Sequence, residues 1–553
     1  MLERLKNIFK TLSLREKRML YGALALLLIA SSAFGVNLAY KITEAVPAFG
    51  GSFTEGILGQ PTFINPVVGS SNDTDRDLIA LLFTGLNTLK EEYKVSGDGR
   101  TYTAILKKDI KWSDGELLTS DDVLFTIETI QDINTKSPLL PTWQGVVVER
   151  LSEREIKFTL KSPYAFFEDN LDELKIIPQH IFGSIPPGNI RLSEYNLEPI
   201  GSGPFAFVKY NKRKDGFITA YYLKRNDFYA GEKPYLDTFQ VKLFADAESL
   251  LKSFNRIEIN GFGGLPIDET KKLSVGFQYF KLNIPRYYAI FLNQGAHLGL
   301  KEKAVRDALN KAVNKDSLIE KVFKGQAETV VGPVLQGTEG FDESIYENYK
   351  FSIEEAQKLL DESLWKLGDD GIREKTFGKN KVKLEFDLIV PQIKFLVDAG
   401  NIVKEEWAKI GVKVTIVGMH PNDINETIIK TRNYQMIMFG NILKSNSDIF
   451  SFWHSSERFY PGLNLAVYEN KKVDALLESI RKDLNTETRI ANLKKLQETM
   501  LNDTPAIFLF SPNYLYVSSK NLKGFDKSFA GTPSNRFDDV YKWHLKTRRV
   551  LKK

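Results

Sequence analysis

Apolar residues recur with two different periods along this chain, and turn residues mark where the period changes. Residues 93–111 alternate between apolar and polar side chains, as strands do, whereas residues 119–132 carry apolar side chains at helical spacing. Between them, residues 113–115 (Ser-Asp-Gly) are typical of a turn. Because Thr119 is a suitable N-cap, a short strand, a turn and a capped helix are predicted over residues 110–132. The stripe expected to be buried consists of Val123, Phe125 or Thr126, Ile127 and Ile130.

The second half of the chain alternates between strand and helix patterns. Residues 287–293 and 434–440 are strongly apolar and are predicted to be buried strands. Two further strands, at residues 384–390 and 412–417, flank a helix at residues 395–410 and predict a βαβ unit. Strands alternating with helices indicate a mostly parallel sheet. Other helices are predicted at residues 303–313, 353–364 and 476–500.

The N-terminus joins a basic segment to a long apolar run. Residues 1–18 carry six Lys and Arg against two Glu, and residues 19–40 are apolar enough to cross a membrane. This charge order places the N-terminus in the cytoplasm and the rest of the chain outside. A retained anchor is favoured, because the charged segment is long and the apolar run continues to Tyr40. The alternatives are a cleaved signal peptide, with its cleavage site at residues 31–33, and a buried helix of a soluble protein.

Composition narrows the class of protein. A chain of 553 residues is too long for one core, so two or three lobes are expected. Aromatic residues reach 12%, which fits either large cores or an aromatic-lined cleft. The net charge is only +5 and no basic stripe is interleaved with aromatics, so nucleic acid is not an expected partner. The absence of cysteine excludes disulfides, thiolate metal sites and a lipid-modified N-terminal cysteine.

No recognised catalytic or metal-binding motif occurs in the sequence. The five histidines form no paired ligand spacing, and there is no nucleophile elbow or Walker A motif. Residues 73–77 (Asp-x-Asp-x-Asp) begin like a calcium loop, but Leu78 stands at position six and Thr84 at position twelve. This stretch therefore predicts the N-terminus of a helix. We expect no catalytic residue, no metal and no cofactor, although sequence alone cannot pair the carboxylates of a hydrolase.

One motif resembles the signature of a known family. Residues 112–125 read W-S-D-G-x-x-x-T-x-x-D-V-x-F, which resembles the extracytoplasmic solute-binding proteins of the oligopeptide, dipeptide and nickel class, the binding subunits of ABC importers. Matching segments cover roughly residues 52–525. They include residues 200–205 (I-G-S-G-P-F), 225–237 (R-N-x-x-Y-x-x-x-x-P-Y-L-D) and 305–313 (V-R-x-A-L-x-x-A-V).

The resemblance implies an α/β fold of the type II periplasmic binding protein (Venus flytrap) kind, with an extra subdomain, after one N-terminal transmembrane or signal helix. The implied division is a cytoplasmic segment at residues 1–18, an anchor or signal peptide at 19–40, a linker at 41–51, lobe I at 52–80, 200–285 and 515–545, an additional subdomain at 81–199, and lobe II at 286–514.

The resemblance also suggests where a ligand sits. In the family the ligand lies between the lobes, and peptide-binding members carry an aromatic and then an Asp that pairs with the peptide's amino group. Here these positions align with Asn441 and Lys444, and a cation would repel an ammonium group. The candidate ligand-binding residues are Gln60, Pro61, Trp143, Asn441, Lys444, Ser445, Asn446 and Asp448.

Three interpretations of Lys444 remain open. The side chain binds a carboxylate, phosphate or sugar hydroxyl of the ligand; or the alignment slips and Asp448 is the amine partner; or Lys444 is a solvated loop charge. Trp143 also has two open interpretations: its side chain either joins a core or lines the ligand-binding cleft.

The expected function follows from the resemblance. The chain would capture a peptide or peptide-like solute by lobe closure and deliver it to an ABC permease with its ATPase subunits. It would act as a monomer on the extracytoplasmic face, tethered to the membrane by its N-terminal helix. The alternatives are a membrane-anchored extracellular hydrolase, a non-transporting receptor or chaperone of the same fold, and a binding protein for an anionic or sugar-like ligand.

Overall fold

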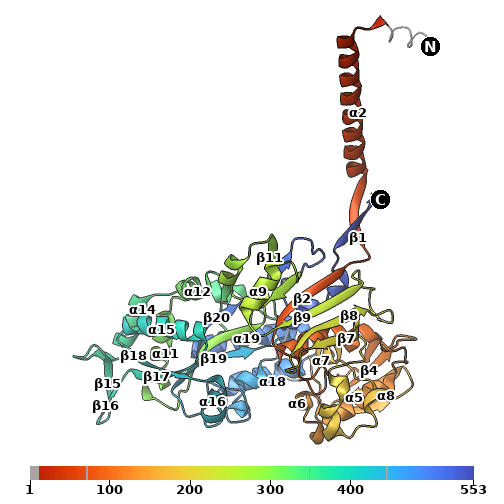
Figure 1. Ribbon diagram of the computed structural model, residues 1–553. Coiled ribbons are helices and arrows are strands. Elements are labelled where there is room, and N and C mark those ends of the chain that lie inside the picture. Colours follow the sequence, from red (N-terminus) through yellow and green to blue (C-terminus); the bar gives the residue numbers. More distant parts are fainter. Residues whose placement is uncertain (1–10, 70–71, 348, 444–445, 553) are drawn as a thin grey trace.

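The computed structural model describes residues 11–69, 72–347, 349–443 and 446–552 (Figure 1). Its largest sheet has seven strands drawn from both ends of the body, and β2 lies parallel to β9 and β10 at its centre. Helices α3 (Asp73–Leu82) and α9 (Ala247–Asn255) belong to this part. In spatial order its strands are β11 (Phe277–Leu282), β21 (Tyr514–Ser519), β10 (Gly261–Gly263), β2 (Ser52–Leu58), β9 (Thr238–Phe244), β8 (Ile218–Arg225) and β7 (Phe205–Lys212).

A second, six-stranded sheet is formed by the later half of the chain. Its order is β13 (Ala327–Thr329), β20 (Ala506–Pro512), β12 (Arg286–Leu292), β19 (Met436–Ile442), β17 (Glu385–Pro391) and β18 (Lys413–Met419). Strands β17 and β18 are parallel and α15 (Lys394–Ala408) connects them, which confirms the predicted βαβ unit. The sheet is mixed, since β12 runs antiparallel to both β19 and β20.

Helices cover this second sheet. They are α11 (Lys303–Lys311), α12 (Lys315–Phe323), α14 (Ile353–Glu362), α18 (Lys471–Lys482) and α19 (Thr486–Asp503). The single helix predicted over residues 476–500 was wrong, because the chain breaks between α18 and α19. Asp483 ends α18, and the Asn485 side chain caps α19 by accepting a hydrogen bond from the Thr488 N–H. A short hairpin sheet, β14 (Lys366–Leu367), β15 (Arg373–Phe377) and β16 (Asn380–Lys383), projects beside it.

A four-stranded sheet is inserted in the sequence between β2 and β7 of the seven-stranded sheet. Its order is β3 (Lys90–Val95), β4 (Thr101–Leu106), β6 (Glu155–Thr159) and β5 (Val147–Arg150), with helices α5 (Ser120–Gln131), α6 (Leu140–Trp143), α7 (Phe167–Glu173) and α8 (Gln179–Phe182). Thr119 caps α5 in a capping box with Asp122, as predicted from the sequence. Thr126, and not Phe125, completes the buried stripe of α5. The predicted strand before it is reduced to one bridge between Lys111 and Leu117.

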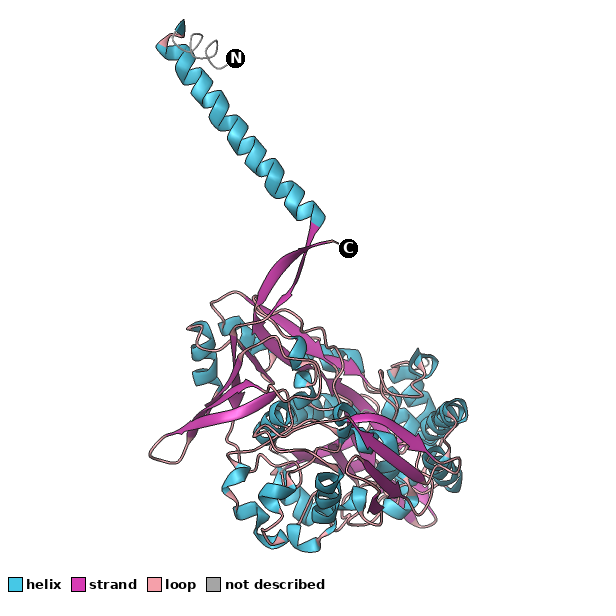
Figure 2. Ribbon diagram, turned by 90° about the vertical axis from the view of Figure 1, so that its right-hand side faces the viewer, coloured by secondary structure: helices cyan, strands magenta, loops and turns pink. Residues whose placement is uncertain are grey.

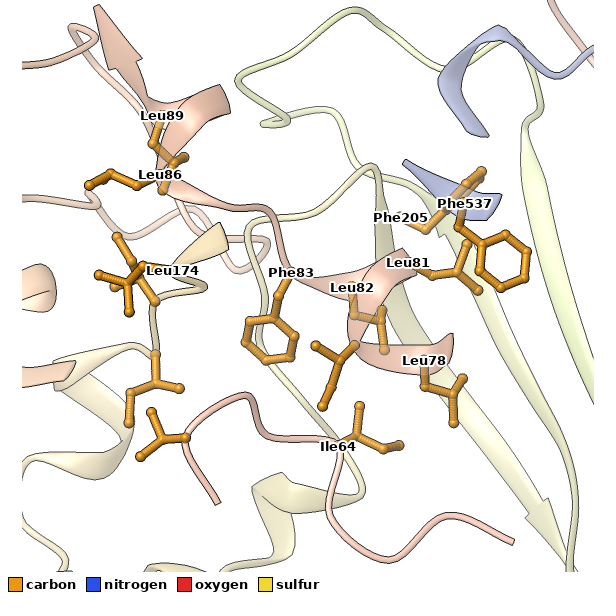
Figure 3. Packing of buried hydrophobic residues seen from close by; sticks show 14 of the residues in the cluster. Ile64, Leu78, Leu81, Leu82, Phe83, Leu86, Leu89, Leu174, Phe205 and Phe537 are labelled. Carbon is orange, nitrogen blue, oxygen red and sulfur yellow. The ribbon is translucent and has the colours of Figure 1, made fainter. Parts of the chain in front are cut away.

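One hydrophobic cluster joins the seven-stranded sheet to the four-stranded sheet. Figure 3 shows Leu81 of α3 beside Phe205 of β7 and Phe537, with Leu86 and other leucines continuing toward the four-stranded part. All of these side chains are buried. The four-stranded sheet is therefore packed on the seven-stranded sheet and shares one hydrophobic core with it.

The acidic run at the start of α3 serves the fold. The Asp75 carboxylate accepts hydrogen bonds from the backbone N–H groups of Thr62 and Phe63, at 2.7 and 3.1 Å. Asp77 pairs with the buried Arg536 at 2.6 Å. Both carboxylates thus already have hydrogen-bond or ion-pair partners within the protein. Across the described part of the chain, no group of three or more His, Cys, Asp or Glu is placed to hold a metal ion.

The N-terminal helix α2 (Leu14–Ile42) projects away from the body, and none of its residues is buried (Figures 1 and 2). By length and composition it could cross a membrane, a test that a signal sequence also passes. The linker predicted over residues 41–51 is largely a strand. This strand, β1 (Thr43–Ala48), pairs antiparallel with β22 (Lys546–Leu551), the last strand of the chain.

Candidate functional site

A cleft of about 770 Å³ lies between the four-stranded part and the second-sheet part. One wall comes from residues 141–170, around α6 and α7, and the other from the segment after β19 together with α18 (Figure 1). The lining is mixed in chemistry and includes Thr142, Ser162, Tyr164 and Asn170 on the first wall and Asn446, Asp448, Phe450, Glu478, Arg481 and Lys482 on the second. Clefts between packed parts of a protein are the usual place for ligands.

The Asp448 carboxylate is the centre of the polar network in this cleft. Arg481 donates to it from Nε, at 2.9 and 3.0 Å, and from Nη2, at 2.9 Å. The Tyr164 hydroxyl donates to the same carboxylate at 2.7 Å from the opposite wall. Burial lowers the pKa of Arg481, but its hydrogen bonds to Asp448 and the charge of that carboxylate outweigh burial and raise the pKa overall. Arg481 is therefore positively charged, and it balances the charge of the Asp448 carboxylate beside it.

Further contacts connect the two walls. The Asn446 side chain donates to the Asp169 carboxylate at 3.0 Å, and the Ala165 N–H donates to the Arg481 carbonyl at 2.7 Å. Phe166 is 3% exposed and belongs to the hydrophobic cluster of the second-sheet part, whereas its neighbour Phe167 belongs to the first cluster. Residues 164–166 thus hold the four-stranded part against α18.

Two predicted ligand-binding residues are packed inside the protein. Trp143 is 2% exposed and its ring packs against Phe158 and Phe167. Asn441 is also buried, and its amide donates to the Tyr287 hydroxyl at 2.8 Å. The Trp143 ring is thus surrounded by aromatic side chains, and the Asn441 amide already has a hydrogen-bond partner. Both side chains therefore lie in the interior of this structure and do not line the 770 Å³ cleft, and for Trp143 this is the core alternative of the sequence analysis.

The remaining predicted residues fall into separate places. Asn446 and Asp448 line the cleft. Gln60 pairs through both amide atoms with the backbone of Ile218, and the half-buried Pro61 follows it on the same loop. Within the described chain, this loop is not part of the lining of the 770 Å³ cleft. Lys444 and Ser445 lie outside the described residues.

Tyr164 and Arg481 are cleft residues that the sequence did not single out. Arg481 occupies the last turn of α18, where a cation is ordinary for any helix. Tyr164 follows Ser162 and Pro163 in a turn, and it is 284 positions away from Asp448 in the sequence. Neither residue forms a local motif, so only the fold brings the three side chains together.

Comparison with known proteins gives consistent similarities. A sequence profile described as "Bacterial extracellular solute-binding proteins, family 5 Middle" matches residues 87–459. The oligopeptide-binding protein AppA of Bacillus subtilis is 28% identical over 529 residues, covering 92% of this chain and 94% of AppA. The structure of AppA in complex with a nonapeptide superposes with a TM-score of 0.69 at 27% identity, over 91% of this chain and all of that one.

Two other solved structures are similar. The ABC transporter substrate-binding protein CtaP from Listeria monocytogenes has a TM-score of 0.77 at 25% identity, covering 90% of this chain and 99% of CtaP. NikZ from Campylobacter jejuni, solved in complex with Ni(L-His), has a TM-score of 0.69 at 25% identity, covering 89% and 99%. Proteins of this shape therefore hold ligands as different as a peptide and a metal chelate.

Proposed function

Since the chain belongs to family 5 of the bacterial extracellular solute-binding proteins, we propose that it captures peptides or peptide-like solutes in the cleft beside Asp448 and Arg481 and passes them to a membrane permease. Capture would proceed by closure of the walls around the ligand, because a closed form gains contacts with the ligand that an open form lacks.

Family membership confirms several of the expectations from the sequence. The predicted resemblance holds, and the fold is the α/β class II periplasmic binding protein fold of the family 5 type, preceded by an apolar helix. The chain is an extracytoplasmic solute-binding protein of ABC import. Proteins of this family bind solutes and are not enzymes, so the hydrolase alternative is discarded.

The chemistry of the cleft supports a peptide-like ligand. Its lining offers both signs of charge, since Asp448 and Glu478 stand beside Arg481 and Lys482. It also offers side-chain amides and aromatic rings, such as Asn170 and Phe450. A peptide carries backbone donors and acceptors, charged ends and variable apolar side chains, and so complements such a mixture. The strongest support for this proposal is the similarity to AppA, whose structure was solved in complex with a nonapeptide.

A non-peptide ligand is the second candidate. Asp448 is already neutralised by Arg481, so the carboxylate that would attract a peptide's ammonium group is not free in this arrangement. The similarity to NikZ in its complex with Ni(L-His) supports the same alternative. An anionic, sugar-like or chelate ligand would then contact the cationic and amide groups of the lining.

Native mass spectrometry of the full chain, purified in mild detergent, distinguishes the two candidates. After denaturation, a heterogeneous set of short peptides supports the proposal. A single anionic, sugar-like or metal-chelate mass supports the alternative. The variant Lys444→Asp tests the loop separately, because a ligand profile that does not change would remove Lys444 from the binding site.

We also propose that α2 is a retained anchor. The span from residues 19 to 40 is about 33 Å long as a helix, which matches the hydrocarbon thickness of a bilayer. The intact mass of the chain extracted from membranes tests this proposal, since cleavage near residue 33 would remove more than 3 kDa, roughly 110 Da for each of the lost residues.

A further inference from the structure

The end of the chain returns to the end of the N-terminal helix. Strands β1 and β22 pair over six positions, from Thr43 opposite Leu551 to Ala48 opposite Lys546. The Lys552 N–H then donates to the carbonyl of Ile42, the last residue of α2, at 2.9 Å. Figures 1 and 2 show this two-stranded ribbon as the connection between α2 and the body. The tether is thus a paired ribbon and not a single flexible strand.

Arg549 fastens the ribbon to the helix. Its Nη2 donates to the carbonyls of Tyr40 and Thr43, at 3.1 and 2.8 Å, and its Nε donates to the Thr43 hydroxyl at 2.8 Å. The guanidinium also lies 4.0 Å from the centre of the Tyr40 ring. All of these acceptors are neutral, so they orient Arg549 without cancelling its positive charge.

Cations gather at the helix end of the ribbon. Lys41, Arg548, Arg549 and Lys552 are all exposed there, against the single acidic residue Glu44. Strand residues rise about 3.4 Å each, so the backbone of Arg549, opposite Ala45, lies roughly 10 Å beyond the end of α2, but its guanidinium reaches back to the Tyr40 carbonyl at 3.1 Å. Lys41 and Lys552 are level with that end. These distances are within or near one Debye length at physiological salt, about 8 Å.

We propose that this helix-proximal end of the ribbon, formed by Lys41, Arg549 and Lys552, binds the headgroups of anionic phospholipids in the leaflet that α2 enters. The inference rests on the proposed retention of α2 as an anchor. Long cationic side chains at a membrane interface reach the headgroups while their aliphatic stems remain on apolar surface, and Tyr40 suits the same depth. The contact would fix the ribbon against the membrane and so set the height and tilt of the body.

The absence of cysteine makes a direct test simple. The full chain with Leu551→Cys, an exposed ribbon position opposite Thr43 at the helix-proximal end, is labelled with bimane and reconstituted in nanodiscs of phosphatidylcholine with 30% phosphatidylglycerol. Bimane quenching is compared for phosphatidylglycerol and phosphatidylcholine that carry the same spin label. The expected ratio is well above one, since each cation near an anionic surface contributes roughly fivefold, and it falls toward one in 0.5 M salt.

Two variants and a control complete the test. Lys41→Gln with Lys552→Gln should lower the quenching ratio only severalfold, because Arg549 still remains at the helix end of the ribbon. Arg549→Gln tests this third cation separately, in case the change weakens the ribbon. Lys212→Gln with Lys214→Gln, at the exposed turn between β7 and β8, should leave the ratio unchanged. A ratio of one in the parent protein, or one insensitive to salt and to the ribbon variants, overturns the proposal. Intact mass measured on the same sample reports loss of α2, so failure of the anchor is distinguished from failure of the ribbon to bind lipid.

Discussion

Arg536 and Glu55, 481 positions apart in the sequence, are hydrogen-bonded in the interior, where Nη2 of Arg536 donates to Oε1 of Glu55 at 3.0 Å. The same guanidinium holds Asp77 of α3, at 2.8 and 2.6 Å, and the Tyr516 hydroxyl donates to Glu55 at 2.8 Å. Arg536 belongs to η7 (Pro533–Phe537), so this cluster ties the C-terminal segment to β2 and α3. It contains two carboxylates and one guanidinium.

Replacing Arg536 with Gln should strongly destabilise the protein. The change removes the cation of this buried cluster and leaves Asp77 without its partner, and breaking a buried pair in this way costs about 3–5 kcal/mol in comparable cases. The free energy of unfolding is measured by urea denaturation followed by circular dichroism. The matched control is Arg213→Gln, whose partner Asp215 is exposed, and it should change stability by less than about 1 kcal/mol. If both variants lost the same free energy of unfolding, the buried cluster would contribute no more to stability than an exposed ion pair.

The stability of the protein should fall as pH rises toward neutrality because of Glu55. Burial raises the pKa of Glu55 from 4.5 to about 7, although Arg536 opposes this shift. The folded protein therefore keeps a proton that the unfolded chain loses above its own pKa. The stability that this proton provides is fully present below pH 4.5 and is lost as pH rises through 7.

Glu55→Gln should flatten this pH dependence, because the amide mimics the protonated acid. Between pH 5 and 7.5 the wild-type protein should lose on the order of 2 kcal/mol more than the variant. Unfolding free energies at several pH values test this, with the exposed Glu92→Gln as the control. A variant whose profile parallels that of the wild type would assign the titration to another group.

Tyr164→Phe should weaken ligand binding without unfolding the protein. The change removes the hydroxyl that reaches Asp448 across the cleft and leaves the ring in place. One such hydrogen bond contributes about 0.5–1.5 kcal/mol, so the Kd of the co-purified ligand should rise roughly 2- to 12-fold in calorimetry. Tyr222→Phe is the control, because that hydroxyl bonds only the exposed Asn211 in the described structure. Equal Kd values for the two variants would show that the bridge does not stabilise the bound form.

Arg481→Gln should change which peptide ends are accepted. Without the guanidinium, Asp448 becomes an unpaired anion in the cleft and can attract an ammonium group. The preference for free over N-acetylated peptides should then rise roughly tenfold, as expected for a charge-assisted hydrogen bond. Arg458→Gln is a fair comparison, since its partner Glu469 is outside the cleft lining described. A preference that does not move in either variant would place the peptide's amino group elsewhere.

Local features were predicted well from the sequence. The cap and buried stripe of α5 and the β17–α15–β18 unit depend on residues close together in the chain, whose spacing is visible directly. The break between α18 and α19 was missed because the apolar pattern continues across it, and only the side chain of Asn485 marks the new start.

The site and the tether were predicted less well, for a physical reason. The polar network of the cleft joins Tyr164 to Asp448 across 284 positions, and no periodicity reports such a pair. Trp143 was open between core and cleft, because its sequence surroundings fit both until the packing of Phe158 and Phe167 decided. The basic C-terminal tail gave no sign that it would form β22 beside β1.

The pairing of β1 with β22 orders events during export. If α2 enters the membrane first, β1 follows it out at once and must wait for about 500 more residues before its partner strand arrives. Every other strand of the body can form earlier. The ribbon is therefore completed later than the sheets of the body described above. The connection between α2 and the body is therefore a single strand until residues 546–551 have been exported, and a paired ribbon afterwards.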